Sequence, residues 1–310
     1  VEPTNAIHDL DEIGMPAWDL LERDAKSART NVITSRGCPF SCTHCYNSWI
    51  KQAYDFKVRR RGALSVVEEC AYLQKMGIQA ISFSDDLFLS NREWIRAFCE
   101  QFARRVPRMT FGCTARVESV LQMKDELHAL KQCGLTAIHI GIESGSERVR
   151  KEMLDRKMTN AQIVEAFRIA RSMGLRTKSF NMVGIPTETL LEAFYTFLLN
   201  LRIRPDILSY YTLIPYPGTT ILAMAIEQGL LPQDFEIFED NFNIQNSSEV
   251  ICPVMATGPM SAETVMALRY LWLAIFNRGL KARLQSLWRG ARSLLGRRTA
   301  RYAKANPSAC

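Results

Sequence analysis

The sequence RGCPFSCTHCYN, residues 36–47, contains three cysteines spaced as C-x3-C-x2-C. It follows a short β-rich run, residues 31–34. Gly37 and Pro39 favour a loop that bends sharply and stays bent. At this spacing one tight loop can bring three thiolates to a single metal ion or cluster. The thiols are those of Cys38, Cys42 and Cys45. The loop is therefore the first candidate for a metal or cluster site.

The number of thiolates restricts what the loop can hold. Four thiolates are typical of a closed zinc site or a fully ligated iron–sulfur cluster. Three suit a 4Fe–4S cluster with one iron left open for chemistry. Zinc remains an alternative, because His44 lies inside the loop and offers a fourth ligand. Three unrelated buried cysteines are the other alternative, and the spacing, the turn residues and the preceding strand disfavour it.

The loop resembles the signature of the radical S-adenosylmethionine (radical SAM) superfamily, C-x3-C-x-aromatic-C, with His44 in the aromatic position. The wider form Gly-Cys-Pro-Phe-x-Cys-x-x-Cys is similar to a branch whose members often carry a cobalamin-binding domain before the radical SAM core. The resemblance implies a 4Fe–4S cluster whose open iron chelates the amine and carboxylate of S-adenosylmethionine. One electron then cleaves the sulfonium to methionine and a 5′-deoxyadenosyl radical. Cobalamin, where used, is expected on a domain that is not in this chain.

Composition indicates a globular protein of a reducing compartment. Apolar residues make up 47% of the chain, which is enough for a hydrophobic core. No apolar run reaches the roughly 18 residues of a transmembrane helix. The nine cysteines form no regular framework, which is typical of proteins without structural disulfides. No signal-peptide pattern is present, so we expect a cytoplasmic protein.

Positive charge is concentrated at the C-terminus. Nine of the 39 Lys and Arg residues and none of the 32 acidic residues lie in residues 278–310, so the remainder carries a net charge of −2. The body of the chain therefore gives no reason to expect nucleic acid. Leu280 to Leu295 form an amphipathic pattern with Trp288 on the apolar side. A helix packed on the core is slightly favoured over one lying on the inner face of the membrane, and a nucleic-acid contact comes third.

From residue 31 onward, β-rich runs alternate with stretches of helical spacing. The runs are 31–34, 79–84, 109–113, 137–142, 176–183 and 207–213, and the helical stretches are 64–76, 91–105, 121–133, 159–173 and 187–201. This alternation predicts an α/β fold with a parallel sheet and helices outside. Six units are two short of a closed TIM barrel. We therefore predict a partial (β/α)6 barrel, an open TIM-like barrel, which is also the fold that the family resemblance implies.

Several helix ends carry recognisable signals. Ser90 is the predicted N-cap of the second helix, and Thr159 with Gln162 predicts a capping box. Glycines follow three helices at the C′ position, namely Gly77, Gly134 and Gly174. We predict three segments along the chain: a linker over residues 1–30, the barrel over 31–220, and a mainly helical extension over 221–310.

Polar residues follow the predicted strands, at the end where parallel barrels place their active sites. S-adenosylmethionine needs acceptors for its ammonium and ribose hydroxyls, a cation for its carboxylate and an apolar slot for adenine. The candidates are Ser84, Asp85, Arg116, Glu143, Ser144, Arg156, Asn181, Val183 and Gly184, together with His44 and Tyr46 in the cysteine loop. Ordinary ion pairs at the rim of the barrel are the alternative for the charged members.

For the methionine half of S-adenosylmethionine, the resemblance implies two contacts. Ser84 and Asp85 occupy the position that contacts the amine, although the usual Gly-Gly-Glu of the family is absent here. Arg156 is similar to the basic residue that holds the carboxylate, and Arg116 is a second candidate for that role.

For the adenosine half, the resemblance implies two further contacts. Glu143 and Ser144 match the position that contacts the ribose, at the end of the fourth predicted strand. Val183 and Gly184 begin a turn similar to the one that backs the adenine, where glycine permits close approach of the backbone.

The sequence thus predicts a radical SAM enzyme that starts methyl transfer, cyclisation or rearrangement at an unactivated carbon. The substrate is unidentified, with lipid-like and natural-product molecules as candidates, and the implied partner is a reductant such as ferredoxin or flavodoxin. The first alternative is a cobalamin-independent radical SAM enzyme that acts by direct hydrogen abstraction. The second is a zinc-stabilised module that binds nucleic acid or membrane. A methylthiotransferase is disfavoured, because no second cysteine set is found.

Overall fold

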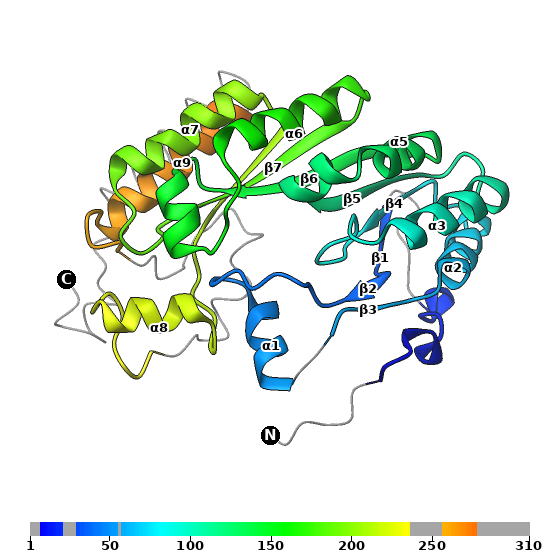
Figure 1. Ribbon diagram of the computed structural model, residues 1–310, viewed down its shortest axis with the longest axis horizontal. Helices are drawn as coiled ribbons and strands as arrows, with labels where there is room; N and C mark the ends of the chain where they lie inside the picture. Colours follow the sequence, from blue (N-terminus) through cyan, green and yellow to red (C-terminus); the bar gives the residue numbers. More distant parts are fainter. Residues whose placement is uncertain (1–6, 21–28, 55–56, 236–255, 278–310) are drawn as a thin grey trace.

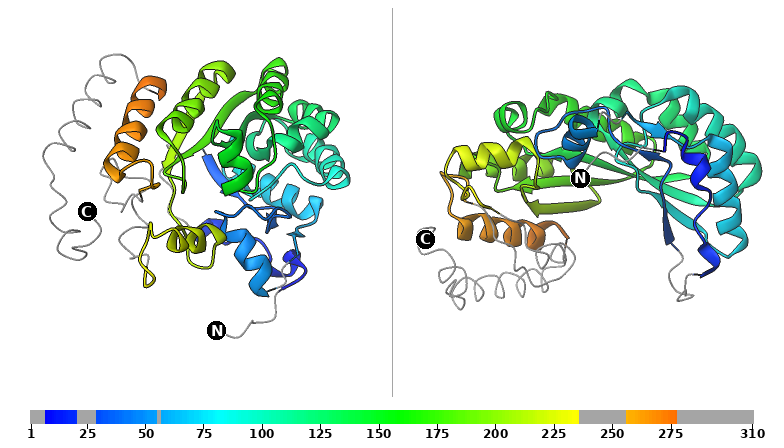
Figure 2. Two further views of the ribbon diagram at one scale, coloured as in Figure 1. Left: turned by 60° about the vertical axis from the view of Figure 1, so that its left-hand side comes forward. Right: turned by 90° about the horizontal axis from the view of Figure 1, so that it is seen from below.

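The computed structural model describes residues 7–20, 29–54, 57–235 and 256–277. Its centre is a curved sheet of parallel strands (Figure 1), in the spatial order β1 (Arg29–Val32), β4 (Ala80–Phe83), β5 (Thr110–Arg116), β6 (Leu135–Glu143), β7 (Arg176–Val183) and β8 (Ile207–Thr212). The connecting helices lie on the convex side of the sheet in all three views (Figure 2). The fold is the predicted partial (β/α)6 barrel.

The helices follow the strands in chain order. Those that connect the strands of the sheet include α2 (Ala63–Lys75), α3 (Arg92–Arg105), α4 (Val117–Gln122), α5 (Lys124–Gln132), α6 (Asn160–Ser172) and α7 (Leu190–Ile203). After β8 come α8 (Thr220–Glu227) and α9 (Ala262–Asn277). The smaller elements are two 3-10 helices (Leu10–Ile13 and Trp18–Leu20), the strands β2 (Ser35–Arg36) and β3 (Arg59–Arg60), the helix α1 (Tyr46–Tyr54) and a π-helical turn (Val149–Met153).

Three elements differ from those predicted. The predicted strand 31–34 ends as β1 at Val32, because the next residues leave the sheet and form β2, which pairs antiparallel with β3. The predicted helix 121–133 covers the last two residues of α4 and all of α5, which are separate helices because the backbone at Met123 (φ −118°, ψ 47°) is not helical. Helix α1, which directly follows the third cysteine, has no counterpart among the predictions.

The predicted helix ends are correct with one exception. Thr159 and Gln162 form the expected capping box, and the three glycines after helices all have positive φ. Ser90, however, is not the N-cap of α3. Asn91 takes that position, because its side chain accepts a hydrogen bond of 2.8 Å from the Trp94 amide. Ser90 Oγ instead accepts a hydrogen bond of 2.7 Å from Arg60.

Successive side chains of each strand face two different environments. On the convex side, residues such as Phe83, Phe111 and Ile140 are at most 1% exposed and belong to one core shared with the helices. On the concave side, His139 and Phe180 are only half-buried. This contrast shows which side of the sheet is sealed and which is accessible, and it leaves the concave side for ligands.

The described part of the C-terminal extension closes the far edge of the sheet. Helix α9 packs on β8 through Trp272 and Tyr210, whose ring centroids are 4.6 Å apart. The predicted basic amphipathic helix, Leu280 to Leu295, lies outside the described residues. Within the described ranges, none of the helices has both the length and the apolar character needed to cross a bilayer.

Candidate functional site

The three cysteines lie on one loop between β2 and α1, at the edge of the barrel where the parallel strands end. All three are free thiols, and Cys42 is the most buried, at 7% exposure. Burial raises the pKa of the Cys38 and Cys45 thiols, with a further rise from the neighbouring cysteines. The cost of forming these two thiolates is offset when a cationic metal centre binds them.

The loop is fixed by segments that are remote in the sequence. The Thr43 amide donates to the Leu154 carbonyl (3.4 Å), and the Thr43 carbonyl accepts from the Ile221 amide (3.1 Å). Gly218 packs against Trp49 of α1 so closely that an added Cβ would lie 2.2 Å from its ring. The cysteine loop is therefore a rigid part of the barrel edge, and its shape depends on residues from the end of the barrel.

The donor set fits an iron–sulfur cluster. Such a cluster takes its thiolates on different iron atoms and is tuned by hydrogen bonds to the sulfurs. Two side chains already point donors at these sulfurs: Arg116 Nη1 lies 3.0 Å from Cys42 Sγ, and Asn47 Nδ2 lies 3.8 Å from Cys45 Sγ. In the part of the chain that the structure describes, no three His, Cys, Asp or Glu side chains are grouped around a position for a single metal ion.

Glu143 and Arg156, which the sequence assigns to different parts of S-adenosylmethionine, form a buried ion pair. Arg156 Nη1 lies 2.6 Å from Glu143 Oε1, and Arg156 Nη2 donates to the Gly141 carbonyl at 2.8 Å. Burial raises the pKa of Glu143, although the positive charges of Arg156 and Arg116 oppose this. Arg156 Nε is buried and has no hydrogen-bond partner among the described residues. The pair therefore retains an unused donor.

The backbone around this pair is unusual. Glu143 has φ 62°, a conformation that few residues other than glycine adopt. It lies where the register between β6 and β7 shifts, between Gly141 and Glu143. A Cβ added to Gly141 would lie 2.4 Å from Glu143 Oε1, so only glycine leaves room for the carboxylate. Strained conformations of this kind are concentrated at functional sites.

His44 lies in the same neighbourhood. Its buried surroundings lower the pKa of the imidazole to about 3, and the charges of Arg156 and Arg116 act in the same direction. The ring is therefore neutral, and its Nδ1 is buried without a hydrogen-bond partner among the described residues. Tyr46, by contrast, is 45% exposed at the start of α1, where its ring packs on Trp49 with 5.0 Å between centroids.

At the end of β4, the two residues predicted to contact the amine of S-adenosylmethionine lie in different environments. Ser84 is exposed, whereas Asp85 is only 3% exposed. Asp85 Oδ1 accepts three hydrogen bonds, from the amide (3.0 Å) and hydroxyl (2.8 Å) of Thr34 and from the Ser35 hydroxyl (2.5 Å). The Asp85 side chain thus holds the segment that leads into the cysteine loop.

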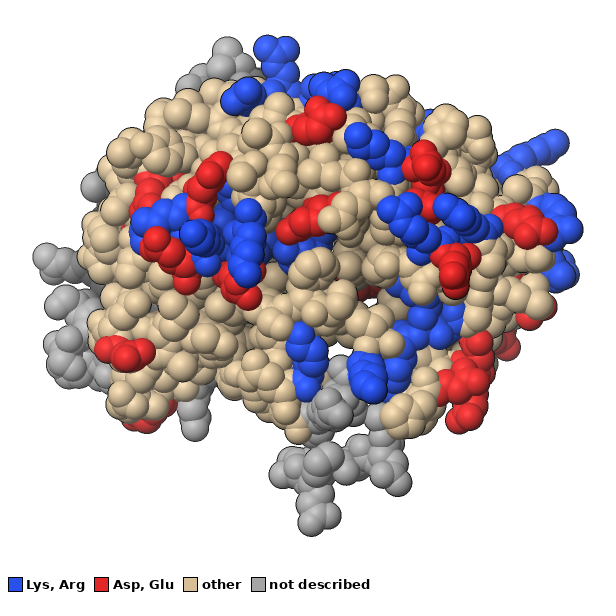
Figure 3. Space-filling view, in the orientation of Figure 1, with Lys and Arg blue, Asp and Glu red and all other residues tan. Residues whose placement is uncertain are grey.

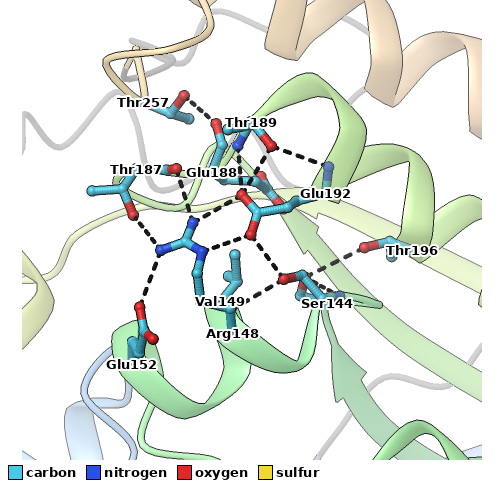
Figure 4. A network of polar contacts seen from close by, with 11 residues as sticks. Ser144, Arg148, Val149, Glu152, Thr187, Glu188, Thr189, Glu192, Thr196 and Thr257 are labelled. Carbon is cyan, nitrogen blue, oxygen red and sulfur yellow. Dashed lines mark hydrogen bonds and ion pairs between the residues drawn. The ribbon is translucent and has the colours of Figure 1, made fainter.

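The remaining candidates point into the packing between sheet and helices. The side-chain Nδ2 of Asn181 donates to Ser179 Oγ (3.1 Å), and its Oδ1 accepts from the side chain of Asn200 of α7 (2.7 Å). Val183 belongs to the apolar cluster beneath α7 and α9. Ser144 is fully buried, and its Oγ lies 3.5 Å from Thr196 Oγ1 (Figure 4). The structure therefore does not bring these three side chains to the cysteine loop.

A second group of charges, absent from the sequence-based candidates, holds the turn after β7 (Figure 4). Glu188 Oε2 accepts hydrogen bonds from the Gly184 (2.9 Å) and Ile185 (3.4 Å) amides, and burial raises the pKa of Glu188 to about 8. Glu192 accepts two hydrogen bonds from Arg148, at 2.7 and 2.8 Å. The Thr189–Glu192 capping box was a signal in the sequence that could have located Glu192.

Comparisons with known proteins agree with this geometry. The model of the radical SAM superfamily matches residues 32–198. The chain is 30% identical over 236 residues to an uncharacterized methyltransferase of Pyrococcus horikoshii, covering 74% of this chain and 50% of that protein. It is 28% identical over 190 residues to the anaerobic magnesium-protoporphyrin IX monomethyl ester cyclase of Cereibacter sphaeroides, covering 60% of this chain and 30% of the cyclase.

Solved structures share the fold. The cobalamin-dependent S-adenosylmethionine radical enzyme OxsB, with aqua-cobalamin and S-adenosylmethionine bound, superposes with a TM-score of 0.60 at 15% identity, covering 90% of this chain and 48% of OxsB. The chain spans no more than half the length of each of these three proteins. With the family model matched from β1 into α7 and three free thiols at the family's cysteine positions, the chain belongs to the radical SAM superfamily.

Proposed function

We propose that this chain is the catalytic core of an enzyme that binds a 4Fe–4S cluster and cleaves S-adenosylmethionine reductively. The observation that carries the proposal is the single loop with three free thiols, held at the barrel edge beside two arginines. When bound, the cluster supplies one electron to the sulfonium, and a 5′-deoxyadenosyl radical results. A low-potential donor such as ferredoxin or flavodoxin would supply that electron.

The ion pair of Arg156 and Glu143 is the proposed cosubstrate contact. Arg156 would hold the carboxylate through donors that include its unpartnered Nε, and Glu143 would accept from the ribose hydroxyls. A buried arginine with a free donor suits an anionic ligand group, because the carboxylate then meets a positive charge without water. The Gly184 amide is already bound by Glu188, so it would back the adenine by shape alone.

The substrate would lie against the concave face of the sheet. His139, Phe180 and Tyr211 are half-buried there, and their rings form a row, with 6.0 Å and 6.4 Å between successive centroids. Lys178 Nζ lies 4.7 Å from the Phe180 centroid and adds one positive charge. Methyl transfer, cyclisation and rearrangement all remain compatible with this surface. Participation of cobalamin is supported by the fold shared with OxsB and by the resemblance of residues 37–45 to the branch that often carries a cobalamin-binding domain.

The test is a triple variant in which Cys38, Cys42 and Cys45 become Ala. Anaerobically reconstituted wild-type protein should bind about four irons and four sulfides per chain, absorb broadly near roughly 400 nm, and release methionine on reduction with S-adenosylmethionine present. The triple variant should lose all three properties. Cys113→Ala is the matched control, because Cys113 is fully buried beneath the convex face and is not part of the loop. A full cluster in the triple variant, or zinc instead of iron in the wild type, would overturn the proposal.

We also propose that the chain contacts an anionic membrane surface through α7. Apart from Arg202, the exposed side chains of this helix are large and apolar, at least 43% exposed each: Leu190, Leu191, Phe194, Tyr195, Leu198 and Leu201. Figure 3 shows mostly uncharged surface where α7 lies. Such an apolar face, with the exposed cation of Arg202 near its C-terminal end, is typical of interfacial helices.

Sedimentation with anionic phospholipid vesicles tests the membrane contact. The double variant Phe194→Glu/Leu198→Glu should lose binding, because it places two negative charges on the apolar face. Removal of residues 278–310 would show what the basic segment adds. The membrane contact is wrong if wild-type protein stays in the supernatant at low salt. It is also wrong if the double variant abolishes self-association of the protein in place of vesicle binding.

A further inference from the structure

The guanidinium of Arg116 is anchored on three sides. Nη1 donates to Cys42 Sγ at 3.0 Å, and Nε and Nη2 donate to the two oxygens of Glu118 at 3.2 and 3.0 Å. Its Cζ lies 3.7 Å from the centroid of the Phe40 ring, which comes from the cysteine loop itself. Arg116 is only 9% exposed, so the cation is held in place against the sulfur with little water around it.

This geometry separates the roles of the two arginines near the loop. Bidentate binding of a carboxylate uses two donors of one guanidinium edge, and in Arg116 the Nε–Nη2 edge is taken by Glu118. In Arg156, Nε is buried and unpartnered. Arg156 is therefore the arginine equipped for the carboxylate of S-adenosylmethionine, whereas Arg116 is directed at a cluster ligand.

A positive charge that donates a hydrogen bond to a ligating thiolate stabilises the cluster form with the extra electron. Hydrogen bonds to the sulfurs, net charge and solvent exposure are the factors that set iron–sulfur potentials. An arginine supplies the first two permanently, because it does not deprotonate in proteins. The ring of Phe40 and the ion pair with Glu118 keep the guanidinium from rotating away.

We propose that Arg116 is a positioning residue that raises the reduction potential of the cluster by donating to Cys42 Sγ, with Phe40 and Glu118 fixing its orientation. The proposal rests on the proposed function, since it presupposes the cluster. It predicts an effect that is present before S-adenosylmethionine binds. A residue that only binds the cosubstrate would have no such effect.

The experiment compares Arg116→Gln, Arg116→Lys and Arg156→Gln as anaerobically reconstituted full chains. The midpoint potential of the cluster is measured without S-adenosylmethionine by dye-mediated titration followed by electron paramagnetic resonance, alongside iron and sulfide content. Arg116→Gln should need about tenfold more reducing conditions, a one-electron shift of about 59 mV to lower potential. Arg116→Lys, which keeps the charge but not the planar fork, should shift less in the same direction.

Arg156→Gln is the matched control, because it removes the same charge without removing a contact to sulfur. It should weaken S-adenosylmethionine binding and shift the potential without cosubstrate much less than Arg116→Gln does, because only the charge is lost and no hydrogen bond to sulfur. An unchanged potential in Arg116→Gln with full cluster content overturns the inference, as does an equal shift in Arg156→Gln. If Arg116→Gln assembles no cluster, the Lys variant decides, and wild-type potential there also overturns it. Failure of the wild type to bind any cluster would instead overturn the proposed function.

Discussion

Two arginines that are close together in the sequence each pair with a glutamate, Arg148 with Glu192 and Arg156 with Glu143, and the two carboxylates behave oppositely. Glu192 accepts from Arg148, from Ser146 and from both the amide and the hydroxyl of Thr189. The hydrogen bonds from Arg148 are the main reason why the pKa of Glu192 falls to about 2. Among the described residues the Glu143 carboxylate has one hydrogen-bond partner, Arg156, and burial raises its pKa.

The difference shows how the same two side chains can serve structure or function. The Arg148–Glu192 pair ties the start of α7 to the segment after β6, with each carboxylate oxygen bonded several times (Figure 4). The Arg156–Glu143 pair retains an unused buried donor, an unfavourable φ at Glu143 and a position beside the cysteine loop. Incomplete hydrogen bonding in a buried pair is costly unless a ligand completes it. We therefore regard the first pair as a clamp and the second as a binding site.

The largest expected effect comes from Glu143→Gln. This change should lower the affinity for S-adenosylmethionine more than tenfold, because losing hydrogen bonds to a charged group costs about 1.5–3 kcal/mol. Cluster content should not change. Anaerobic equilibrium binding measures the dissociation constant. If it matches the wild-type value, Glu143 and Arg156 form only a structural pair and the comparison loses its functional half.

A smaller effect, on a different property, is expected from Glu192→Gln. The variant should unfold with a free energy about 1–2 kcal/mol lower, a value reduced by the 39% exposure of the Arg148 side chain. Urea titration of the apo-protein measures it, and binding of S-adenosylmethionine should be unaffected. Glu165→Gln is the control, because its pair with Arg168 is on the surface, where solvent screens the attraction and the pair should contribute little to stability. A stability loss no larger than that of the control would show that the Arg148–Glu192 pair does not act as a clamp.

The smallest effect is the pH dependence of the two variants. The folded pKa of Glu192, about 2, lies below its ordinary value of 4.5. Its stabilisation is therefore complete above that ordinary value and is lost as the pH falls through it toward the folded pKa. Glu143 has a raised folded pKa, so its ionisation reduces stability as the pH rises above the ordinary value.

Urea titrations at several pH values distinguish the two signs. The stability difference between wild type and Glu192→Gln should shrink between about pH 5 and pH 3. Wild type should lose stability relative to Glu143→Gln as the pH rises above the ordinary value of 4.5. Parallel pH profiles for the two variants would contradict the opposite placement of the two carboxylates.

The barrel could be predicted from the sequence because its signals are local. Strand β7 has the bounds predicted for it, 176–183, and the capping box at Thr159 lies where expected. The break of the predicted helix 121–133 at Met123 had no glycine or proline to mark it. The departure of Ser35 and Arg36 from the first strand depends on pairing with residues 59–60, which local patterns do not contain.

For the candidate site, the sequence predicted which residues lie there better than it predicted which of them bind each other. The sequence placed Arg116, Glu143 and Arg156 near the strand ends, and the structure does bring them to the cysteine loop. The sequence could not show that Glu143 and Arg156 bind each other, since the pair joins the end of β6 to a segment beyond the following π-helical turn. Asn181 lies on the predicted strand. The two-residue alternation of β7, however, turns its side-chain amide toward α7, and its hydrogen-bond partners are Ser179 of β7 and Asn200 of α7.

The contact between Thr43 and Ile221 has a consequence for the order of events during synthesis. Ile221 is made 176 residues after Cys45, which at roughly 5–20 residues per second is about 9–35 s later. During that interval the three thiols have been made, but the backbone bond that closes their loop against the end of the barrel cannot yet form. The backbone frame of the cysteine loop is thus completed only late in synthesis, well after its three thiols have been made.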